Sequence, residues 1–400
     1  MTRASHQPII ERRSGKTERE LGISGQAGLV DCDFTLALNN RTGKFFFCGD
    51  LIAGSKDLIR NVYYWRLGFD QIPTGLIARI LGRLAVVEID LRVRHPRTLP
   101  TFLSRRDRVP IVFTDPREVL IHDLRETDII LCHDVGPLTH PTFYADGVEQ
   151  IYRAAFDRIA EAKPHLLFAS ESSCEEFKLL YGDDFPYLGV LYPPIRFGAG
   201  SSDQQPVTSI TGKFFLSVGS LGTRKNQLRA IEAFGRSGLV EKGYRYVICG
   251  GPEPGAEHVI AAADRTPGVL IPGYVNDPQL RWLYSHAEGF ILPSLLEGFG
   301  LPAAEAIHYG VIPMLSRGGA LEEVAGPSAI LVDPLDVDAI VQGMHQIAVM
   351  SEGEKTQRLD QMRTSIARFS TENALGVWRS VLSRAASLHQ HVGASRSTSR

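Results

Sequence analysis

The stretch GFILPSLLEGFGLPAAEAIHYGVIPMLS, residues 289–316, decides the fold of this 400-residue chain. It begins with the short apolar run GFILPS and continues through a loop that contains Glu297 and two glycines. A helical pattern follows, which Pro302 opens and Gly310 closes, and the apolar run VIPMLS comes next. Short apolar runs that alternate with helical patterns are typical of strands in a parallel sheet covered on both faces.

The same alternation extends outward in both directions. In the C-terminal half the further predicted strands are KFFLSVGS (213–220), RYVICGG (245–251), GVLIPGYV (268–275) and AILVDP (329–334). Two predicted helices begin at capping residues, one at Asn226 and one at Asp277-Pro278, and two more cover 319–326 and 340–347. In the N-terminal half the predicted strands are FFFCGDLI (45–52), AVVEIDLRV (85–93), VPIVFT (109–114), DIILCHD (128–134) and HLLFAS (165–170), with helices over 75–84 and 144–162. We therefore predict two doubly wound α/β domains.

Composition sets the limits of these domains. The termini are polar or charged and the segment 198–212 is small and turn-forming. We predict a disordered segment 1–25, an N-terminal domain 26–197, a linker 198–212, a C-terminal domain 213–386 and a disordered tail 387–400. In open α/β sheets ligands bind outside the carboxyl ends of the strands, so we expect the functional residues at strand ends beside a central cleft.

Charge and cysteine content exclude several classes of protein. The chain has 43 basic and 45 acidic residues, a net charge of -2, so no global field would hold it on nucleic acid. Five scattered cysteines without a C-x-x-C spacing argue against a disulfide framework and a structural zinc site. The first twenty residues lack the apolar core of a secretory signal, and the most apolar stretch, 290–307, contains two glutamates and two prolines. We expect a cytoplasmic protein; attachment to a membrane surface stays open.

The segment EGFGLPAAE, 297–305, carries the clearest chemistry. Glu297 lies on the loop and Glu305 lies in the predicted helix, so two carboxylates flank a turn with Gly298 and Gly300. Glycines let backbone amides approach a ligand, and a helix N-terminus favours phosphate or sugar oxygens. An ordinary acid-rich, solvated helix start is the alternative interpretation.

This Glu-x7-Glu segment resembles the signature of the retaining glycosyltransferases of family 4, which have the GT-B fold. VGSLGTRKNQLRAIEAF (218–234) resembles the family's phosphate-binding segment, and PGYVNDPQLRWLYSHAEGFILPS (272–294) resembles its base-binding strand and helix. IILCHDVGPLTHPTFY (129–144) resembles the His-Asp segment of the mannosyltransferase-like branch, and IPTGLIARIL (72–81) the glycine turn into the first helix. The resemblance implies GT-B architecture: two Rossmann-like doubly wound domains facing a central cleft.

The resemblance also implies roles for individual residues. Glu305 would hold the ribose hydroxyls of a nucleotide sugar, Glu297 would lie at the transferring sugar, and Lys225 would neutralise the diphosphate leaving group. His133 would face the donor sugar from the N-terminal domain. The remaining implied donor-binding positions are Phe299, Gly300 and Leu301 through their amides, Tyr274 and Val275 at the base, and Gly75 and Gly219 beside the diphosphate. No metal ligand and no cofactor are implied.

Each role has a simpler alternative. Arg224 and Lys225 could form a solvated helix start, His133 could be a core histidine with satisfied ring nitrogens, and Gly75 could serve only a helix-entry turn. Relatives commonly carry an arginine where this chain has Ser220, and Arg224 is our candidate for the second positive charge. GGPEPG (250–255) lacks the spacing of a dinucleotide fingerprint, and Asp31-x-Asp33 stands too early to be a metal motif.

We therefore predict a metal-independent retaining hexosyltransferase. It would move a hexose, with mannose from GDP-mannose as our first choice, to a glycan or lipid-linked oligosaccharide in bacterial surface polysaccharide synthesis. The enzyme would be cytoplasmic, with a peripheral contact at the inner membrane face left open. Two other interpretations remain: a non-catalytic GT-B subunit that binds a sugar nucleotide, and a sugar-nucleotide epimerase or hydrolase.

Overall fold

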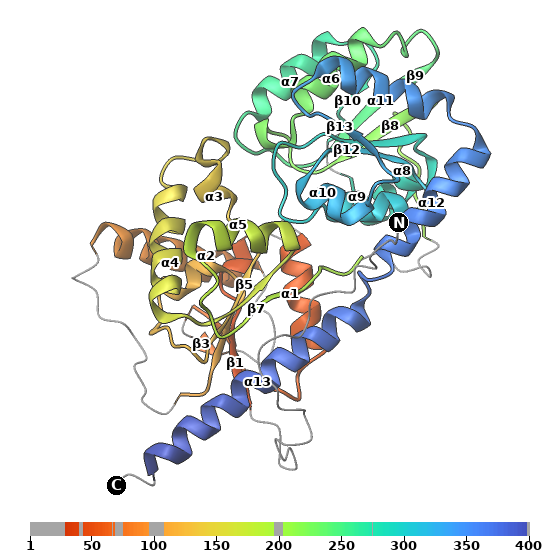
Figure 1. The fold of residues 1–400 in the computed structure, drawn as a ribbon. Helices are drawn as coiled ribbons and strands as arrows, with labels where there is room; N and C mark the ends of the chain where they lie inside the picture. Colours follow the sequence, from red (N-terminus) through yellow and green to blue (C-terminus); the bar gives the residue numbers. More distant parts are fainter. Residues whose placement is uncertain are drawn as a thin grey trace.

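The computed structural model describes residues 29–39, 43–65, 67–68, 75–95, 108–195, 203–273 and 275–397, with side chains described through residue 390. The predicted disordered segment 1–25 lies outside these residues. Figure 1 shows two α/β units, one from each half of the chain, and a long C-terminal helix that returns along the N-terminal unit. This arrangement confirms the predicted class of two doubly wound α/β domains.

The N-terminal unit is built on a seven-stranded sheet of order β3-β2-β1-β4-β5-β6-β7, parallel except for the edge pair β2–β3. Its strands are β1 (Val30–Asp33), β2 (Ile59–Tyr64), β3 (Leu67–Gly68), β4 (Ile111–Phe113), β5 (Ile129–Cys132), β6 (His165–Phe168) and β7 (Leu188–Val190). Its helices are α1 (Gly43–Ala53), α2 (Gly75–Arg94), α3 (Gly136–Thr139), α4 (Val148–Ala162) and α5 (Glu171–Tyr181), with 3-10 helices η1 (Leu36–Asn39), η2 (Pro116–Leu120) and η3 (Pro141–Phe143).

The C-terminal unit has a six-stranded, wholly parallel sheet of order β10-β9-β8-β11-β12-β13. Its strands are β8 (Lys213–Val218), β9 (Tyr244–Cys249), β10 (Val269–Leu270), β11 (Gly289–Leu292), β12 (Pro313–Ser316) and β13 (Ile330–Val332). Its helices are η4 (Thr223–Lys225), α6 (Gln227–Arg236), α7 (Ala256–Arg265), α8 (Asp277–His286), α9 (Leu301–His308), α10 (Gly319–Ala325), α11 (Val337–Val349) and α12 (Glu352–Ile366). Because β8 and β11 are neighbours, the loops that follow them meet at one edge of the sheet.

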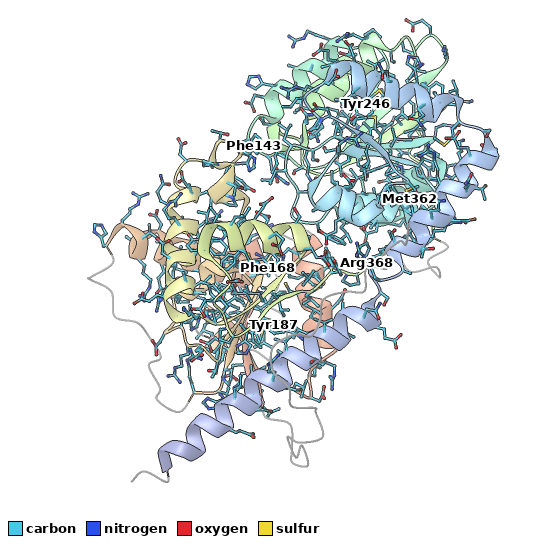
Figure 2. The ribbon with its side chains drawn as sticks, in the orientation of Figure 1. Phe143, Phe168, Tyr187, Tyr246, Met362 and Arg368 are labelled. Carbon is cyan, nitrogen blue, oxygen red and sulfur yellow. The ribbon has the colours of Figure 1, made fainter. Side chains whose placement is uncertain are left out.

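Each unit has its own apolar core. Figure 2 shows Phe168 among the side chains of the N-terminal unit and Tyr246 among those of the C-terminal unit; both are fully buried. Arg368 lies at the junction of the two units, where its guanidinium stacks 4.8 Å from the ring of Tyr192. All five cysteines are buried and free.

Two predicted strands of the N-terminal half are wrong. The segment 45–52 belongs to helix α1, in which Phe47, Cys48, Leu51 and Ile52 are buried at helical spacing. The segment 85–93 is the second half of α2, in which Ala85 and Ile89 are buried while Val86, Val87 and Leu91 are exposed. A run that is apolar on both sides of a helix has the same appearance as a buried strand, which explains the second error.

The C-terminal boundary also differs from the prediction. Helix α13 (Thr371–Ser397) begins inside the predicted C-terminal domain 213–386, but its apolar residues join the core of the N-terminal unit. Trp378 is fully buried there, and its Nε1 donates a hydrogen bond to Ser55 Oγ at 2.9 Å. Residues 387–397, predicted as a disordered tail, continue this helix because its first turns are already anchored on the sheet.

Two helix starts differ in detail from the prediction. Asn226 precedes α6 in a left-handed conformation (φ 57°), and its side chain donates to Pro293 O and Pro334 O instead of capping the helix. Helix α8 is capped by Asn276, in a capping box with Gln279, one residue before the predicted cap Asp277. Among the described residues, no helix combines the length and apolar character needed to cross a membrane.

Candidate active site

Lys225 and Glu297 meet where β8 and β11 end. Lys225 closes η4, the turn after β8, and Glu297 lies on the loop after β11. Lys225 Nζ donates to Glu297 Oε1 at 2.6 Å, and Ser294 Oγ donates to the same oxygen at 2.7 Å. The side chains of Lys225 and Glu297 are only 8% and 7% exposed. The sheet order therefore brings together two residues that lie 72 positions apart and that the sequence analysis assigned to one site.

Arg224 adds a second cation to this pair. Its guanidinium lies 3.5 Å from Glu297 Oε2 and within 3.2 to 3.3 Å of both carboxylate oxygens of Glu253. Its carbonyl accepts a hydrogen bond from Leu295 N at 2.9 Å, which ties the two loops together. Arg224 is therefore no freely solvated residue: it points into the same cluster as Lys225.

Electrostatics keep Glu297 ionised. Burial alone would raise the pKa of this carboxyl, but Lys225, Arg224 and the hydrogen bond from Ser294 outweigh it and hold the pKa below its usual value. The cluster consists of two cations and, with Glu253, two carboxylates. An incoming anion could replace a carboxylate as the partner of both cations, which would compensate the charge of that anion.

Glu253 is a member of the cluster that sequence analysis missed. It lies in GGPEPG (250–255), the segment after β9, which the sequence analysis rejected as a dinucleotide fingerprint and did not assign to the site. Strand β9 is the other neighbour of β8, so its following loop also reaches this edge. Only the strand order places Glu253 at this site, and the sequence does not reveal the strand order.

Glycines make room for Lys225. Gly219 has φ 146°, and a Cβ there would lie 3.2 Å from Lys225 Cε. At Gly250 a Cβ would lie 1.9 Å from Gly219 O, so the ends of β8 and β9 approach as closely as backbone allows. Gly219 thus lies beside Lys225; its predicted contact with a diphosphate stays a prediction. Ser220 is partly buried, and its carbonyl accepts from Gln227 Nε2.

The loop 297–301 ends in a turn that only glycine can make. Gly300 has φ 102° and caps α9 without a side-chain hydrogen bond. Phe299 is buried against Phe369, with ring centroids 4.9 Å apart, and Leu301 begins the helix. One turn later Glu305 is 5% exposed, and Tyr284 donates its hydroxyl to Glu305 Oε2 at 2.9 Å. The Glu305 carboxylate is therefore positioned by a buried tyrosine.

The N-terminal unit contacts this loop through His133 and Asp134. A Cβ on Gly298 would lie 2.6 Å from His133 O and 3.1 Å from Asp134 Oδ2. The His133 ring points into its own domain, with Nε2 3.1 Å from Thr114 O. Burial, helped by Lys44, lowers the pKa of His133 to about 3, so the ring is neutral near pH 7. The backbone of His133 faces the other unit, as does the carboxyl of Asp134, which we had not assigned to the site.

Two of the predicted positions, Gly75 and Val275, are not brought into the cluster. A Cβ on Gly75 would meet nothing within 4 Å, and Gly75 is exposed at the start of α2. One helix start that faces the C-terminal unit is instead that of α1, where a Cβ on Gly43 would lie 3.6 Å from Leu301. Val275 packs, partly buried, against the C-terminal core, and Tyr274 lies outside the described residues.

Further contacts hold the two units together beside the cluster. The carboxylate of Glu323 in α10 accepts from the backbone amides of Glu171 and Ser172, at 2.8 and 3.1 Å. These amides form the N-terminus of α5 in the other unit, where a negative charge is favoured. Ser173 Oγ donates to Gly298 O at 3.3 Å. Helix α5 is therefore bonded directly to the loop that carries Glu297.

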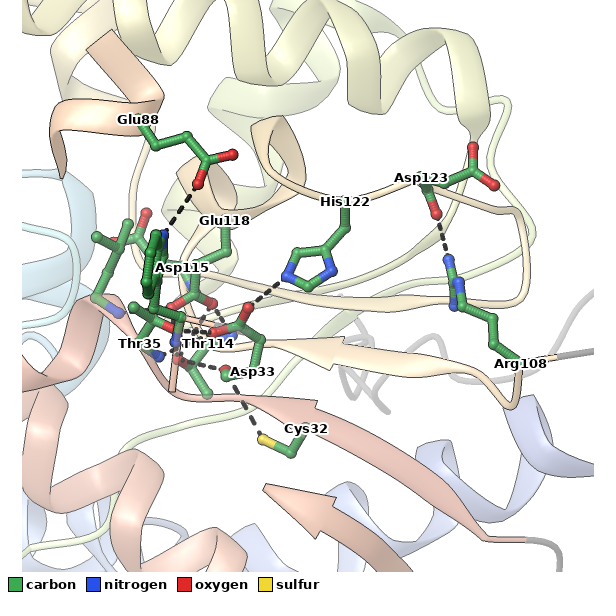
Figure 3. Close-up of polar contacts among 12 residues, drawn as sticks. Cys32, Asp33, Thr35, Glu88, Arg108, Thr114, Asp115, Glu118, His122 and Asp123 are labelled. Carbon is green, nitrogen blue, oxygen red and sulfur yellow. Dashed lines mark hydrogen bonds and ion pairs between the residues drawn. The ribbon is translucent and has the colours of Figure 1, made fainter. Parts of the chain in front are cut away.

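A second buried polar cluster lies at the carboxyl end of β1 (Figure 3). Asp33 Oδ2 lies 2.6 Å from His122 Nε2, and Asp33 Oδ1 accepts from Thr35 Oγ1 at 2.6 Å. The Glu118 carboxylate accepts hydrogen bonds from three backbone amides, those of Leu36, Thr114 and Asp115. Asp31 pairs instead with Arg60. Within the described residues, no group of three or more His, Cys, Asp or Glu side chains could hold a metal ion.

Comparison with known proteins shows which family part of the chain resembles. Residues 202–363 match the family described as glycosyl transferases group 1. The O-antigen chain mannosyltransferase B of Escherichia coli is 27% identical over 284 residues, which cover 66% of this chain and 72% of that protein. The serotype-specific mannosyltransferase WbdA of the same organism is 26% identical over 262 residues, 61% of this chain but 32% of WbdA, so the match spans about a third of that relative.

Solved structures show the same fold. A UDP-forming α,α-trehalose-phosphate synthase from Burkholderia xenovorans superposes with a TM-score of 0.61 at 14% identity, covering 90% of this chain and 99% of that one. The N-terminal domain of the Candida albicans trehalose-6-phosphate phosphatase gives a TM-score of 0.63 at 12% identity, with coverage of 90% and 99%. Together the comparisons confirm the GT-B fold and the resemblance to a mannosyltransferase-like branch.

Proposed function

We propose that this chain, whose residues 202–363 match the group 1 glycosyltransferases, is a retaining hexosyltransferase of family 4 that uses a nucleoside diphosphate sugar. One observation carries the proposal: Lys225, Arg224 and Glu297 form a single buried cluster at adjoining strand ends, against the N-terminal unit. The leaving diphosphate gains negative charge as the glycosidic bond breaks. Fixed cations favour that state over the ground state, which is how such a cluster would accelerate transfer.

In the free protein, Glu297 is the counter-ion of both cations. When a donor binds, its diphosphate would take over Lys225 and Arg224, and the Glu297 carboxylate would be released toward the transferring sugar. We propose that the two cations supply the charge compensation for which other transferases use a divalent metal, so that the reaction needs no metal and no cofactor. Glu305, oriented by Tyr284, would accept hydrogen bonds from ribose hydroxyls.

His133 would act as a neutral hydrogen-bonding group. With Nε2–H donating to Thr114 O, its Nδ1 is left as an acceptor, which suits a sugar hydroxyl. A neutral ring adds no charge to a cluster that already balances two cations against carboxylates. The Asp134 carboxyl, beside Gly298, is a second candidate for contact with the sugar.

The substrates are proposed from the relatives. Two of the similar proteins are mannosyltransferases, one of them named for the O-antigen chain, which supports GDP-mannose as donor and a glycan or lipid-linked oligosaccharide as acceptor. Surface polysaccharide synthesis would then place the enzyme in the cytoplasm, at the inner face of the membrane.

Calorimetric titration with GDP-mannose, UDP-glucose, GDP and UDP tests the donor site. We expect one base to be preferred, and Lys225→Ala to weaken binding of its diphosphate at least tenfold. Lys213→Ala, at the opposite end of β8, is the matched control and should bind normally. Failure of every nucleotide to bind would contradict the proposal, and turnover of the donor without acceptor would favour an epimerase or hydrolase.

A further inference from the structure

Helix α2 exposes an apolar surface that the catalytic site does not use. Seven of the seventeen large apolar side chains exposed among the described residues lie on this one helix, and Leu76, Ile77 and Val87 are 72%, 57% and 55% exposed. Figure 1 shows α2, in orange, projecting at the outer edge of the N-terminal unit. Such a concentration of exposed apolar side chains marks an interaction surface.

The exposed residues form one stripe. Leu76, Ile80, Leu84, Val87 and Leu91 follow one another at intervals of four, four, three and four residues, so they share one side of the helix. The opposite side is buried in the N-terminal core through Ala78, Leu81, Gly82, Ala85, Glu88 and Ile89. The stripe is therefore not the side that packs on the core. The helix makes its core contacts through the opposite side and is apolar on its outer side as well.

Arginines run beside the stripe. Arg79 and Arg83 each precede a stripe residue and are exposed on the neighbouring row of the helix. Glu88 pairs with Arg92 and Asp90 with Arg94, but none of the carboxylates that the structure describes pairs with Arg79 or Arg83. Helix α2 thus carries four arginines against two acidic residues, while the whole chain is slightly acidic.

We propose that α2 docks the protein on an anionic lipid bilayer, lying in the plane of the interface. The apolar stripe would enter the boundary between head groups and acyl chains, and Arg79 and Arg83 would contact lipid phosphates. A protein partner would equally cover the apolar residues, but two arginines along one border that pair with none of the described carboxylates favour a surface of dense negative charge. This inference does not depend on the catalytic assignment; combined with it, docking would bring the cleft to a lipid-linked acceptor.

Sedimentation with vesicles of phosphatidylcholine, alone or with one quarter phosphatidylglycerol, tests the proposal without any donor. We expect binding to the anionic vesicles that weakens as salt is raised. Ile80→Glu with Val87→Glu should reduce binding at least tenfold. Arg79→Gln with Arg83→Gln should reduce it about fivefold for each arginine at low salt. Val349→Glu, at a more exposed apolar residue on α11, is the control and should bind like the wild type.

All substituted side chains are exposed, so unchanged melting temperatures will show that the variants fold. Absence of wild-type binding to anionic vesicles would overturn the proposal, as would binding that neither double variant changes. Sedimentation velocity tests the alternative that a second copy of the chain covers the stripe. If the protein self-associates, does not bind vesicles, and loses self-association in Ile80→Glu with Val87→Glu, the stripe joins two copies of the chain.

Discussion

We assign two roles to Glu297. It is the counter-ion of Lys225 in the free protein, and it lies beside the reacting sugar in the complex. The pair is almost wholly buried, and removing one partner of a buried pair leaves an uncompensated charge. The donor diphosphate would therefore have to supply the charge that Glu297 supplies in its absence. Variants at this residue affect both stability and catalysis, so the two must be measured separately.

Glu297→Gln should lower turnover at saturating donor by about 10² to 10³, the usual effect of losing a positioned group that acts in the transition state. Glu305→Ala, in contrast, should mainly raise the donor KM. Glu253→Gln is the control: it also contacts Arg224 but is 38% exposed, and should retain most of the turnover. Near-native turnover of Glu297→Gln would show that the carboxylate serves only as a counter-ion.

Arg224→Ala should weaken binding of the nucleoside diphosphate by about 1.5 to 3 kcal/mol, the range for a hydrogen bond to a charged group. The reason is that Arg224 points into the cluster of Lys225 and Glu297. Adding Ser220→Arg should restore part of the affinity, because it returns a cation to the position that relatives use. Calorimetry on the three proteins decides; an unchanged affinity in Arg224→Ala would mean that Glu253 retains the guanidinium when the diphosphate binds.

His133 should make stability depend on pH in the acid range. Burial lowers its pKa to about 3, whereas the unfolded chain binds this proton below about pH 6.5. Stability should therefore fall as the pH is lowered between these values, by up to about 1.4 kcal/mol per pH unit from this ring. His133→Gln, whose amide can still donate to Thr114 O, should show a shallower fall in urea denaturation. An identical pH slope in both proteins would show that the ring is protonated in the folded state.

At the scale of elements, prediction from sequence succeeded where apolar runs were short and flanked by turn residues. All six strands of the C-terminal sheet were predicted, because five of the six runs end at a glycine, proline or serine and the sixth, 268–275, contains Pro272 and Gly273. It failed at α1, whose short apolar run 45–52 also suits a buried strand, and at α2, where neighbouring apolar residues face both the core and the surface. Strand β1 was missed because its alternate residues, Asp31 and Asp33, are buried acids whose partners Arg60 and His122 lie far along the chain.

The sequence did not predict that helix α13 packs on the N-terminal unit. This packing yields a prediction of stability. Trp378→Ala should cost about 3 to 5 kcal/mol, because it removes a fully buried side chain and the hydrogen bond to Ser55. Val377→Ala, on the exposed side of the same helix, should cost less than about 1 kcal/mol. Chemical denaturation measures both. Equal costs for the two variants would show that α13 does not stabilise the N-terminal unit.

At the scale of the whole molecule, the site is an assembly of strand ends. The loops after β8, β9 and β11 supply Lys225, Glu253 and Glu297, and the N-terminal unit closes against Gly298. Sequence predicted the first and third because their motifs are distinctive. It did not predict Glu253, Asp134 or the helix start at Gly43, since these join the site only through strand order and the packing of the two units.

The cluster also predicts the response to metal removal. If Lys225 and Arg224 compensate the leaving diphosphate, dialysis against EDTA should leave the rate of transfer within about twofold of the untreated value. The assay is the same with and without chelator, and re-added Mg²⁺ or Mn²⁺ should have no effect. Loss of activity that either ion restores would show that a metal carries the diphosphate.

Transfer centred on Lys225 and Glu297 is tested most directly by the release of nucleoside diphosphate from the donor that binds best, measured with and without a membrane-derived glycan acceptor. We expect release that requires acceptor, matches the sugar incorporated one for one, and is lost in Glu297→Gln but not in Glu253→Gln. Release that is independent of acceptor, or that is equal in the two variants, would contradict a transfer reaction centred on Lys225 and Glu297.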